Sequence, residues 1–339
     1  MISDRFDVSV SILPSNSAWQ SMFEIHVGHC TEVMKTLDAE SIDCCVTSPP
    51  YWGLRDYGAP EQIGHETHPL DYVKCIVEAM REVRRLLRDD GTLWLNLGDS
   101  YAGSGKGRNG DGSLGKMASA KQRSSVGSYL GSVPATKSIE GLKPKDLVGI
   151  PWRVAFALQD DGWFLRQDII WAKPNPMPES VTDRCTRAHE YLFLLSKSRR
   201  YHFDVHAISE PGTTSARRQR RSVWNIVPKT FPGAHFATFP EELVEPCVLA
   251  GSRIGGKVLD PFLGSGTTAA VALALGRSAV GIELNPEYAE LARNRIQQQV
   301  PLFAASDTRS KTTDDRSLRA ATTASKKSQK VAKTPARKG

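Results

Sequence analysis

The sequence predicts an α/β protein built on a doubly wound, mostly parallel β-sheet with helices on both faces. Apolar runs of strand length alternate with segments of helical spacing along most of the chain, which is the order typical of parallel strands joined by crossover helices. Two of these strands, 41–47 and 257–260, end directly in turns that contain proline or glycine. Because ligands of such sheets bind at the carboxyl ends of the strands, we expect the functional site there.

The first predicted elements lie in the N-terminal third of the chain. The run 41–47 is short and apolar and ends at a Pro-Pro turn, which favours a buried strand. Apolar residues recur at helical spacing over 70–87. The Asp-Asp-Gly triplet at 89–91 is expected to end that helix before a strand over 92–97.

The remaining elements continue the same alternation of strands and helices. In the first of them, Pro151 marks either a kink or a late start of the helix. The predicted elements are a helix over 147–158, strands over 164–171 and 190–195, a helix over 241–250, a strand over 257–260, a helix over 267–275, a strand over 278–283 and a helix over 286–298.

The composition is that of a soluble globular protein with a sizeable core: 339 residues, of which 40% are hydrophobic and 24% charged. No apolar run reaches about 18 residues, so no transmembrane helix is predicted. The first residues lack the basic start and apolar core of a signal peptide. The six cysteines form no CxxC pair, so we expect reduced core thiols and no metal site.

The net charge of +7 is concentrated at one end of the chain. Residues 302–339 hold ten Lys or Arg against three Asp, which accounts for the whole net charge. We therefore expect a folded domain over 1–301 and a basic, disordered tail over 302–339. Within the domain, the Gly-, Ser- and Lys-rich stretch from about 100 to 145 is expected to be a mobile loop.

A strand-to-helix turn near the C-terminus has the pattern of a nucleoside site. The strand ends in Asp260, a turn with Gly264 and Gly266 follows, and a helix begins at Thr267. Glu283 ends the next strand, at the separation from the turn that suits hydrogen bonds to ribose hydroxyls. The turn lacks the lysine of a phosphate loop and the full GxGxxG spacing. On its own it could equally be an ordinary tight turn.

The second motif, TSPPYWGLRDYG, follows the strand 41–47 directly and runs from Thr47 to Gly58. A Ser-Pro-Pro-Tyr turn can be a structural kink at a strand end. Two prolines also stiffen a loop, so that polar groups beside them are held in place. If the sheet is doubly wound, this loop and the turn after Asp260 meet at adjacent strand ends.

Together these motifs resemble the DNA amino-methyltransferases. The string DPFLGSGTT, 260–268, is similar to their S-adenosylmethionine motif, and the segment 235–240 is similar to the motif that precedes it. The segments WLNLGD, 94–99, and WAKPNPMP, 171–178, resemble later motifs that border the target-base pocket. With the catalytic motif before the cofactor motif, the chain resembles the permuted β class, the N4-cytosine/N6-adenine family, over residues 23–298 or so.

The resemblance implies a Rossmann-like fold of the class I S-adenosylmethionine-dependent methyltransferases. It implies that the domain over 1–301 is the methyltransferase domain. The residues expected to bind the cofactor are Thr47, Phe239, Asp260, Pro261, Phe262, Gly264, Ser265, Gly266, Thr267, Glu283 and Asn285.

The resemblance also assigns catalysis to Ser48, Pro49, Pro50 and Tyr51. A base amine is a poor nucleophile, so it must lie in line with the sulfonium methyl, with acceptors facing its protons. The Ser48 side chain and the Pro49 carbonyl can supply those acceptors. Tyr51 offers a ring face to a base extruded from the duplex, and Trp52 can add to it.

The identity of the target base depends on Ser48. Family members with Ser at this position mostly methylate the exocyclic amine of cytosine, and those with Asp mostly that of adenine. N4-cytosine is therefore expected, with N6-adenine as the alternative. A carbon-5 enzyme would need a Pro-Cys nucleophile, and the pair at 246–247 lies in a predicted helix. An inactive DNA-binding protein with this fold, and methylation of RNA or of a protein amide, are further alternatives.

Basic residues beside these motifs are candidates for contacts with double-stranded DNA, although any one of them could equally lie on a solvated face. The region from about 179 to 234 is the candidate target-recognition region. The basic tail is expected to add salt-sensitive affinity. The candidate DNA-binding residues are Trp52, Lys106, Arg108, Lys173, Arg217, Arg218, Arg220 and Arg221.

The resemblance extends to biological setting. It implies an enzyme of bacterial or phage origin that works in the cytoplasm on DNA, within a restriction–modification system. A cognate restriction endonuclease is then a candidate partner. Monomer and homodimer are both compatible with the sequence.

Overall fold

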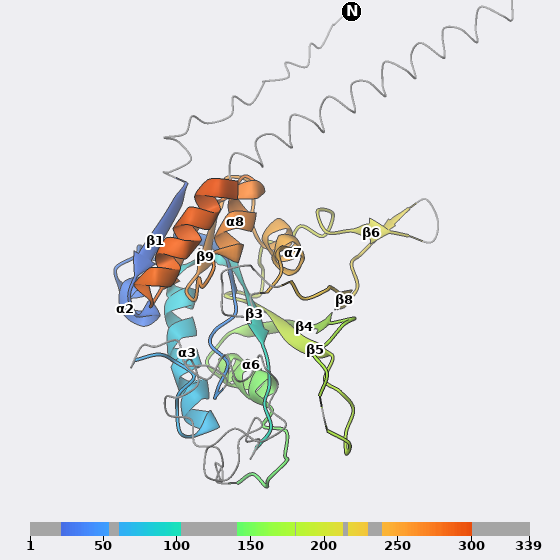
Figure 1. Ribbon diagram of the computed structural model, residues 1–339. Helices are drawn as coiled ribbons and strands as arrows, with labels where there is room; N and C mark the ends of the chain where they lie inside the picture. Colours follow the sequence, from blue (N-terminus) through green and yellow to red (C-terminus); the bar gives the residue numbers. More distant parts are fainter. Residues whose placement is uncertain are drawn as a thin grey trace, which may run out of the picture.

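An eight-stranded β-sheet forms the centre of the protein in the computed structural model (Figure 1). The structure describes residues 22–53, 61–102, 141–179, 181–212, 216–229 and 239–299. Expectations for Lys106, Arg108, most of the loop at 100–145 and the tail at 302–339 therefore lie outside the described residues. In spatial order the strands are β1 (Phe23–Val27), β10 (Ser278–Glu283), β9 (Lys257–Asp260), β2 (Ile42–Thr47), β3 (Leu87–Leu97), β5 (His189–Ser196), β4 (Phe164–Ala172) and β8 (Val223–Asn225).

Most neighbouring strands run parallel, which confirms the predicted doubly wound sheet. The pairs β1–β10, β10–β9, β9–β2, β2–β3 and β4–β8 are parallel. Among the described strands of this sheet, β5 alone is antiparallel to its neighbours. After β4 the chain turns back, and β5 lies between β4 and β3. The carboxyl ends of β10, β9, β2, β3 and β4 therefore lie at the same edge of the sheet.

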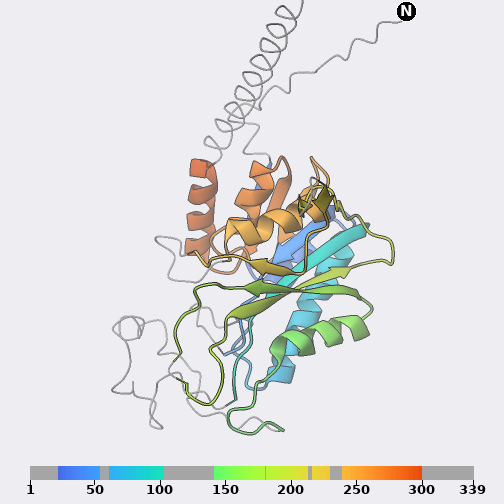
Figure 2. The same cartoon turned by 90° about the vertical axis from the view of Figure 1, so that its right-hand side faces the viewer.

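Helices cover both faces of the sheet (Figure 2). The alternation of side chains along β3 separates two cores: Leu93 and Leu95 pack with one set of helices, and Trp94 packs with the other. No helix within the described ranges is long and apolar enough to cross a membrane. The first core takes α2 (Cys30–Lys35), α3 (Pro69–Leu86) and α6 (Ile150–Asp160); the second takes α7 (Glu241–Gly251), α8 (Thr267–Ala274) and the helical residues 286–299.

The structure differs from the sequence prediction at the margins of the sheet. Strand β1, helix α2 and strand β8 were not predicted, because they are short and do not show a clear apolar period. Strand β3 begins at Leu87, whereas the Asp-Asp-Gly triplet had indicated a turn. The register with β2 jumps from Ile42–Leu87 to Cys44–Thr92, so the polar triplet forms an irregularity within the strand instead of a break before it.

Helix α6 is fixed by a carboxylate that follows β3. Asp99 Oδ1 accepts hydrogen bonds from the backbone N–H groups of Ser100 (2.9 Å), Gly149 (2.9 Å) and Ile150 (3.0 Å). Gly149 has a left-handed φ of 76°, and Pro151 stands in the first turn. The prediction of a late start is thus confirmed, and the first N–H groups of the helix are satisfied by a side chain from another element.

Backbone pairing joins the two chain segments on either side of the undescribed residues 103–140. Ala102 N donates to Asp146 O (2.8 Å), and Lys145 N donates to Ala102 O (2.9 Å). Tyr101 forms a bridge with Leu147, and Val148 N donates to Ser100 O (2.9 Å). These contacts form a closed stem beside the start of α6.

Replacing Asp99 with alanine is expected to lower the free energy of unfolding by about 2 kcal/mol, because three backbone donors lose one acceptor. Urea unfolding followed by circular dichroism measures this loss. Asp99→Asn keeps an oxygen acceptor and serves as the matched control, so it should retain most of the stability. Equal losses in both variants would contradict the capping role.

Candidate active site

The two sequence motifs meet through one buried hydrogen bond. Strands β2 and β9 are adjacent and parallel, with Cys45 beside Leu259. At their carboxyl ends, Thr47 Oγ1 donates to Asp260 Oδ1 over 2.6 Å, and both residues are about 1% exposed. The prediction that the Ser-Pro-Pro-Tyr loop and the glycine turn come together is therefore confirmed.

The turn after β9 is shaped by backbone donors and by two glycines. Phe262 N donates to Asp260 Oδ1 (3.1 Å), which curls the chain back on the strand end. Gly264 and Gly266 adopt left-handed φ angles of 52° and 81°. A Cβ at Gly266 would stand 3.0 Å from Ala292 Cβ, so this position also needs a small residue for close packing. Pro261, Ser265 and Thr267 are buried within the same turn.

Asp260 is an incompletely satisfied buried carboxylate. Its Oδ2 atom has no hydrogen-bond partner among the described residues. Burial raises the pKa of Asp260 to about 6, and the hydrogen bond from Thr47 opposes that shift. An acid in this state is stabilised by a cationic or hydrogen-bond-donating ligand at the strand end.

Glu283 closes the turn from the end of the neighbouring strand β10. Its Oε2 accepts from Gly264 N (2.8 Å) and its Oε1 from Asn285 N (2.9 Å). Burial raises the pKa of this carboxyl, and the backbone donors counteract the rise. Each carboxylate oxygen has more than one acceptor site, so the pair of oxygens retains capacity for a diol such as ribose.

Arg295 stabilises the turn, a role that the sequence did not predict. Its Nη1 donates to Ser265 Oγ and Thr267 Oγ1, both at 3.0 Å, and its Nη2 donates to Glu241 Oε1 (2.8 Å) on α7. The side chain is only 8% exposed. An arginine in an amphipathic helix ordinarily lies in solvent, and no local pattern distinguishes this one.

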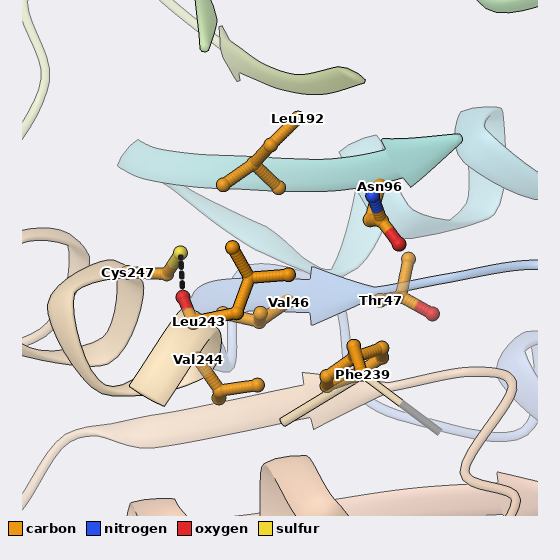
Figure 3. A pocket seen from close by; sticks show the side chains of 8 residues that line it. All are labelled: Val46, Thr47, Asn96, Leu192, Phe239, Leu243, Val244 and Cys247. Carbon is orange, nitrogen blue, oxygen red and sulfur yellow. Dashed lines mark hydrogen bonds between the residues drawn. The ribbon is translucent and has the colours of Figure 1, made fainter. Parts of the chain in front are cut away.

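A small cavity lies beside the carboxyl end of β2, on the α7 face of the sheet (Figure 3). Thr47, Asn96 and Phe239 lie toward one end of it. Phe239, predicted from the segment before α7, thus lies at the carboxyl end of β2 with Thr47. The lining residues are Val46, Thr47, Asn96, Leu192, Phe239, Leu243, Val244 and Cys247.

Cys247 belongs to the core, as predicted for the Pro-Cys pair. It is fully buried in α7, and its Sγ donates to Leu243 O (3.2 Å). Burial raises the pKa of the thiol well above its usual value. A thiol held protonated in a helix is unsuited to attack a carbon of a base.

The Ser-Pro-Pro-Tyr loop is held in place by helix α3. The hydroxyl of Tyr72, which is fully buried, donates to Pro50 O over 3.0 Å. Pro49 is buried, whereas Ser48 and Tyr51 are half-buried. The loop therefore presents its polar side chains on a rigid main chain.

Hydrogen bonds to Asn96 and Glu190 orient Ser48 and Tyr51. Ser48 Oγ donates to Asn96 Oδ1 (3.2 Å), and Asn96 Nδ2 donates to Tyr191 O (3.1 Å). The Tyr51 hydroxyl lies 2.9 Å from Asn96 Oδ1 and 2.7 Å from Glu190 Oε2. A Cβ at Gly98 would stand 2.4 Å from Tyr51 Cε2, so the ring packs directly on this backbone. The sequence indicated the segment 94–99 but not Asn96 as a contact.

Trp52 and Lys173, both predicted to contact DNA, have internal partners. Trp52 is 7% exposed, and its Nε1 donates to Glu66 O (2.9 Å), so its ring packs in the core. Lys173 forms an ion pair with Glu190 and lies over the ring of Trp171, with Nζ 4.2 Å from the centroid.

The arginine cluster at 217–221 lies on the β8 side of the sheet. Arg217 and Arg218 form β7, which pairs with β6 (Glu210–Pro211) in a ribbon that projects from the body (Figure 1). Arg217 and Arg221 are exposed, whereas Arg220 lies over Trp224, with its guanidinium carbon 4.5 Å from the ring centroid. In the sheet, β3, β5 and β4 separate β8 from β2, the strand that leads into the Ser-Pro-Pro-Tyr loop.

Known sequences show the family of this chain. The family model described as DNA methylase matches residues 42–294. The Type II methyltransferase M.SmaI of Serratia marcescens is 54% identical over 296 residues, covering 86% of this chain and 96% of its own. The Type II methyltransferase M.Cfr9I of Citrobacter freundii is 51% identical, covering 80% of this chain and 86% of its own.

Solved structures share the fold. TTHA0409 of Thermus thermophilus, complexed with S-adenosyl-L-methionine, has a TM-score of 0.54 at 26% identity and covers 82% of this chain and 95% of its own. PvuII DNA methyltransferase (cytosine-N4-specific) has a TM-score of 0.58 at 20% identity, with 82% and 92% covered. The family predicted from the motifs is confirmed: the chain belongs to the N6/N4 DNA methylase family.

Proposed function

We propose that this DNA methylase transfers the methyl group of S-adenosylmethionine to the exocyclic N4 amine of cytosine in double-stranded DNA. The observation that carries the proposal is the hydrogen bond between Thr47 and Asp260, because it holds the Ser-Pro-Pro-Tyr loop beside the glycine turn. A methyl donor in the turn and an amine at the loop would then lie within one site.

The residues around the turn fit this cofactor. The unpartnered Oδ2 of Asp260 suits a cationic ligand, and Glu283 suits the ribose hydroxyls. Phe239 lies at the cavity next to Thr47, and Arg295 braces Ser265 and Thr267. When bound, the cofactor supplies the electrophilic methyl group. The relative from Thermus thermophilus, which was solved with this cofactor, supports the assignment.

Asn96 orients the Ser48 hydroxyl so that its oxygen can accept a hydrogen bond from an amine. The amide of Asn96 is oriented by its bond to Tyr191 O, so that Oδ1 faces the Ser48 hydroxyl. When the Ser48 hydrogen points to Asn96, the oxygen lone pairs of Ser48 are left to accept an N–H of the base. Tyr51 supplies the ring for a base that has left the helical stack.

The choice of cytosine follows from Ser48, since the loop resembles those of family members that carry Ser and mostly act on cytosine. N6-adenine methylation is the alternative. We further propose that residues 1–301 form the methyltransferase domain, with target recognition in 179–234 or nearby. Because the relatives are Type II methyltransferases, a cognate restriction endonuclease and a bacterial cytoplasmic setting are part of the proposal.

Incubation with labelled S-adenosylmethionine and mixed-sequence DNA, followed by nucleoside analysis, tests the proposed activity. Label is expected in N4-methylcytosine. Label in adenine would reject the cytosine assignment, and no label in DNA would reject the activity.

Ser48→Ala is expected to lower kcat by about 10- to 100-fold, because one hydrogen bond to the reacting amine is lost. The cofactor Kd, measured by titration calorimetry, should stay unchanged. Asp260→Ala is the contrasting variant, which should weaken cofactor binding. Full turnover by Ser48→Ala would rule out its role in positioning the amine.

Cofactor affinity is expected to fall in acid because of Asp260. With a pKa of about 6, its carboxyl is ionised at higher pH, and the charge that attracts a cation is lost as the pH falls through 6. The Kd should rise about tenfold for each pH unit below that value. Titrations at pH 7.5 and 5.0 measure the effect, and Asp260→Asn should remove its pH dependence. The same pH dependence in this variant would assign the effect to another group.

A further inference from the structure

The Tyr51 hydroxyl is held by residues outside the catalytic loop. It donates to Glu190 Oε2 over 2.7 Å, the shortest contact it makes among the described residues. Glu190 stands on β5, opposite Trp171 of β4, and 139 residues beyond Tyr51 in the chain. The contact thus ties the loop after β2 to the antiparallel part of the sheet.

Glu190 is held in turn by Lys173. Their side chains form an ion pair and are only 17% and 19% exposed, respectively. The Lys173 ammonium also lies over the Trp171 ring, and the indole Nε1 of Trp171 donates to Ile226 O (2.9 Å). A cation fixed in this way restricts the orientation of the adjacent carboxylate.

Strand register explains why these groups converge. Directly opposite residues on neighbouring strands present their side chains on the same face. Asn96 pairs with Leu192, and Glu190 lies two residues before Leu192, so Asn96 and Glu190 share a face. Trp171 pairs with Glu190, and Lys173 follows it by two residues. Asn96 of β3 and Glu190 of β5 therefore contact Tyr51 from a single face at the carboxyl edge, and Lys173, which directly follows β4, contacts Glu190 on the same face.

The network also sets the direction of the hydrogen bond. A carboxylate only accepts, so the Tyr51 hydroxyl must donate when it pairs with Glu190. Burial, reinforced by the charge of Glu190, raises the pKa of Tyr51 well above its usual value, which keeps the hydroxyl protonated. With the Tyr51 hydrogen on Glu190, Asn96 Oδ1 is left to Ser48.

We propose that Glu190, anchored by Lys173, is a positioning residue for methyl transfer: it fixes the Tyr51 ring and reserves Asn96 for Ser48. This inference rests on the proposed function, because Tyr51 and Ser48 face the target base in that proposal. Packing on Gly98 holds one side of the ring, and the bond to Glu190 prevents rotation about that contact.

A double-mutant cycle tests the inference in the full-length protein, with labelled transfer to mixed-sequence DNA as the assay. Glu190→Ala and Tyr51→Phe should each lower kcat by about 10- to 100-fold, the effect of losing a hydrogen bond to a charged group. If Glu190 acts through the Tyr51 hydroxyl, the double variant should match Tyr51→Phe within about twofold. Losses that multiply would overturn the inference.

Two further variants separate positioning from folding. Glu190→Gln keeps an acceptor for Tyr51, so kcat should recover to within about tenfold of wild type while the cofactor Kd stays unchanged. Asp161→Asn is the matched control: Asp161 is 16% exposed and paired with Arg81 at 2.6 Å, but lies at the far end of α6. It should keep wild-type kcat. A Glu190→Gln variant no better than Glu190→Ala would contradict the acceptor role.

A substitution at Lys173 tests whether this residue anchors Glu190 or contacts DNA. Lys173→Gln should lower kcat and leave the DNA KM within about twofold of wild type, because its charge acts on Glu190. A raised DNA KM with unchanged kcat would instead assign Lys173 to DNA binding and overturn the anchor. If the wild-type protein labels no DNA, the proposed function is rejected. If the wild-type protein is active and the Glu190 variants have the same kcat, this inference alone is rejected.

Discussion

The hydrogen bond between Thr47 and Asp260 is the contact on which the site depends. It joins residues 213 positions apart at the ends of two adjacent parallel strands, in an environment that excludes water. A buried carboxylate without such a donor would be strongly destabilised. The parallel pairing of β2 with β9 places the two side chains within hydrogen-bond distance, so the site depends directly on the order of the strands in the sheet.

The parts of the site that directly follow a strand could be predicted from the sequence. Strand β2, strand β9 and their turns were predictable because each is a short apolar run closed by proline or glycine. The order of the two motifs along the chain then indicated the permuted β class of the family they resemble. Helix α6 was predicted, with a kink or a late start at Pro151, and the structure shows the late start, because proline fits the first turn of a helix.

The supporting residues could not be predicted, because they act across the sheet. Arg295 and Glu190 look like surface charges in their own segments, and only register and helix packing reveal their partners. Trp52 is the reverse case: its place beside the Ser-Pro-Pro-Tyr loop predicted an exposed ring for stacking, whereas the ring is buried and its indole N–H donates to a carbonyl in the core. Local sequence reports residue chemistry well and three-dimensional neighbours poorly.

The closed stem beside α6 has a consequence for how the enzyme tolerates change in chain length. The pairing of Ala102 with Asp146 and Lys145 returns the chain to its starting point before α6 begins. Because the chain leaves and returns at this pairing, the described positions of β3 and α6 are fixed without reference to the length of the connection, and doubling the length of such a closure costs only ~0.6 kcal/mol. Homologous chains with a connection of another length are therefore expected to keep the same arrangement of strand ends.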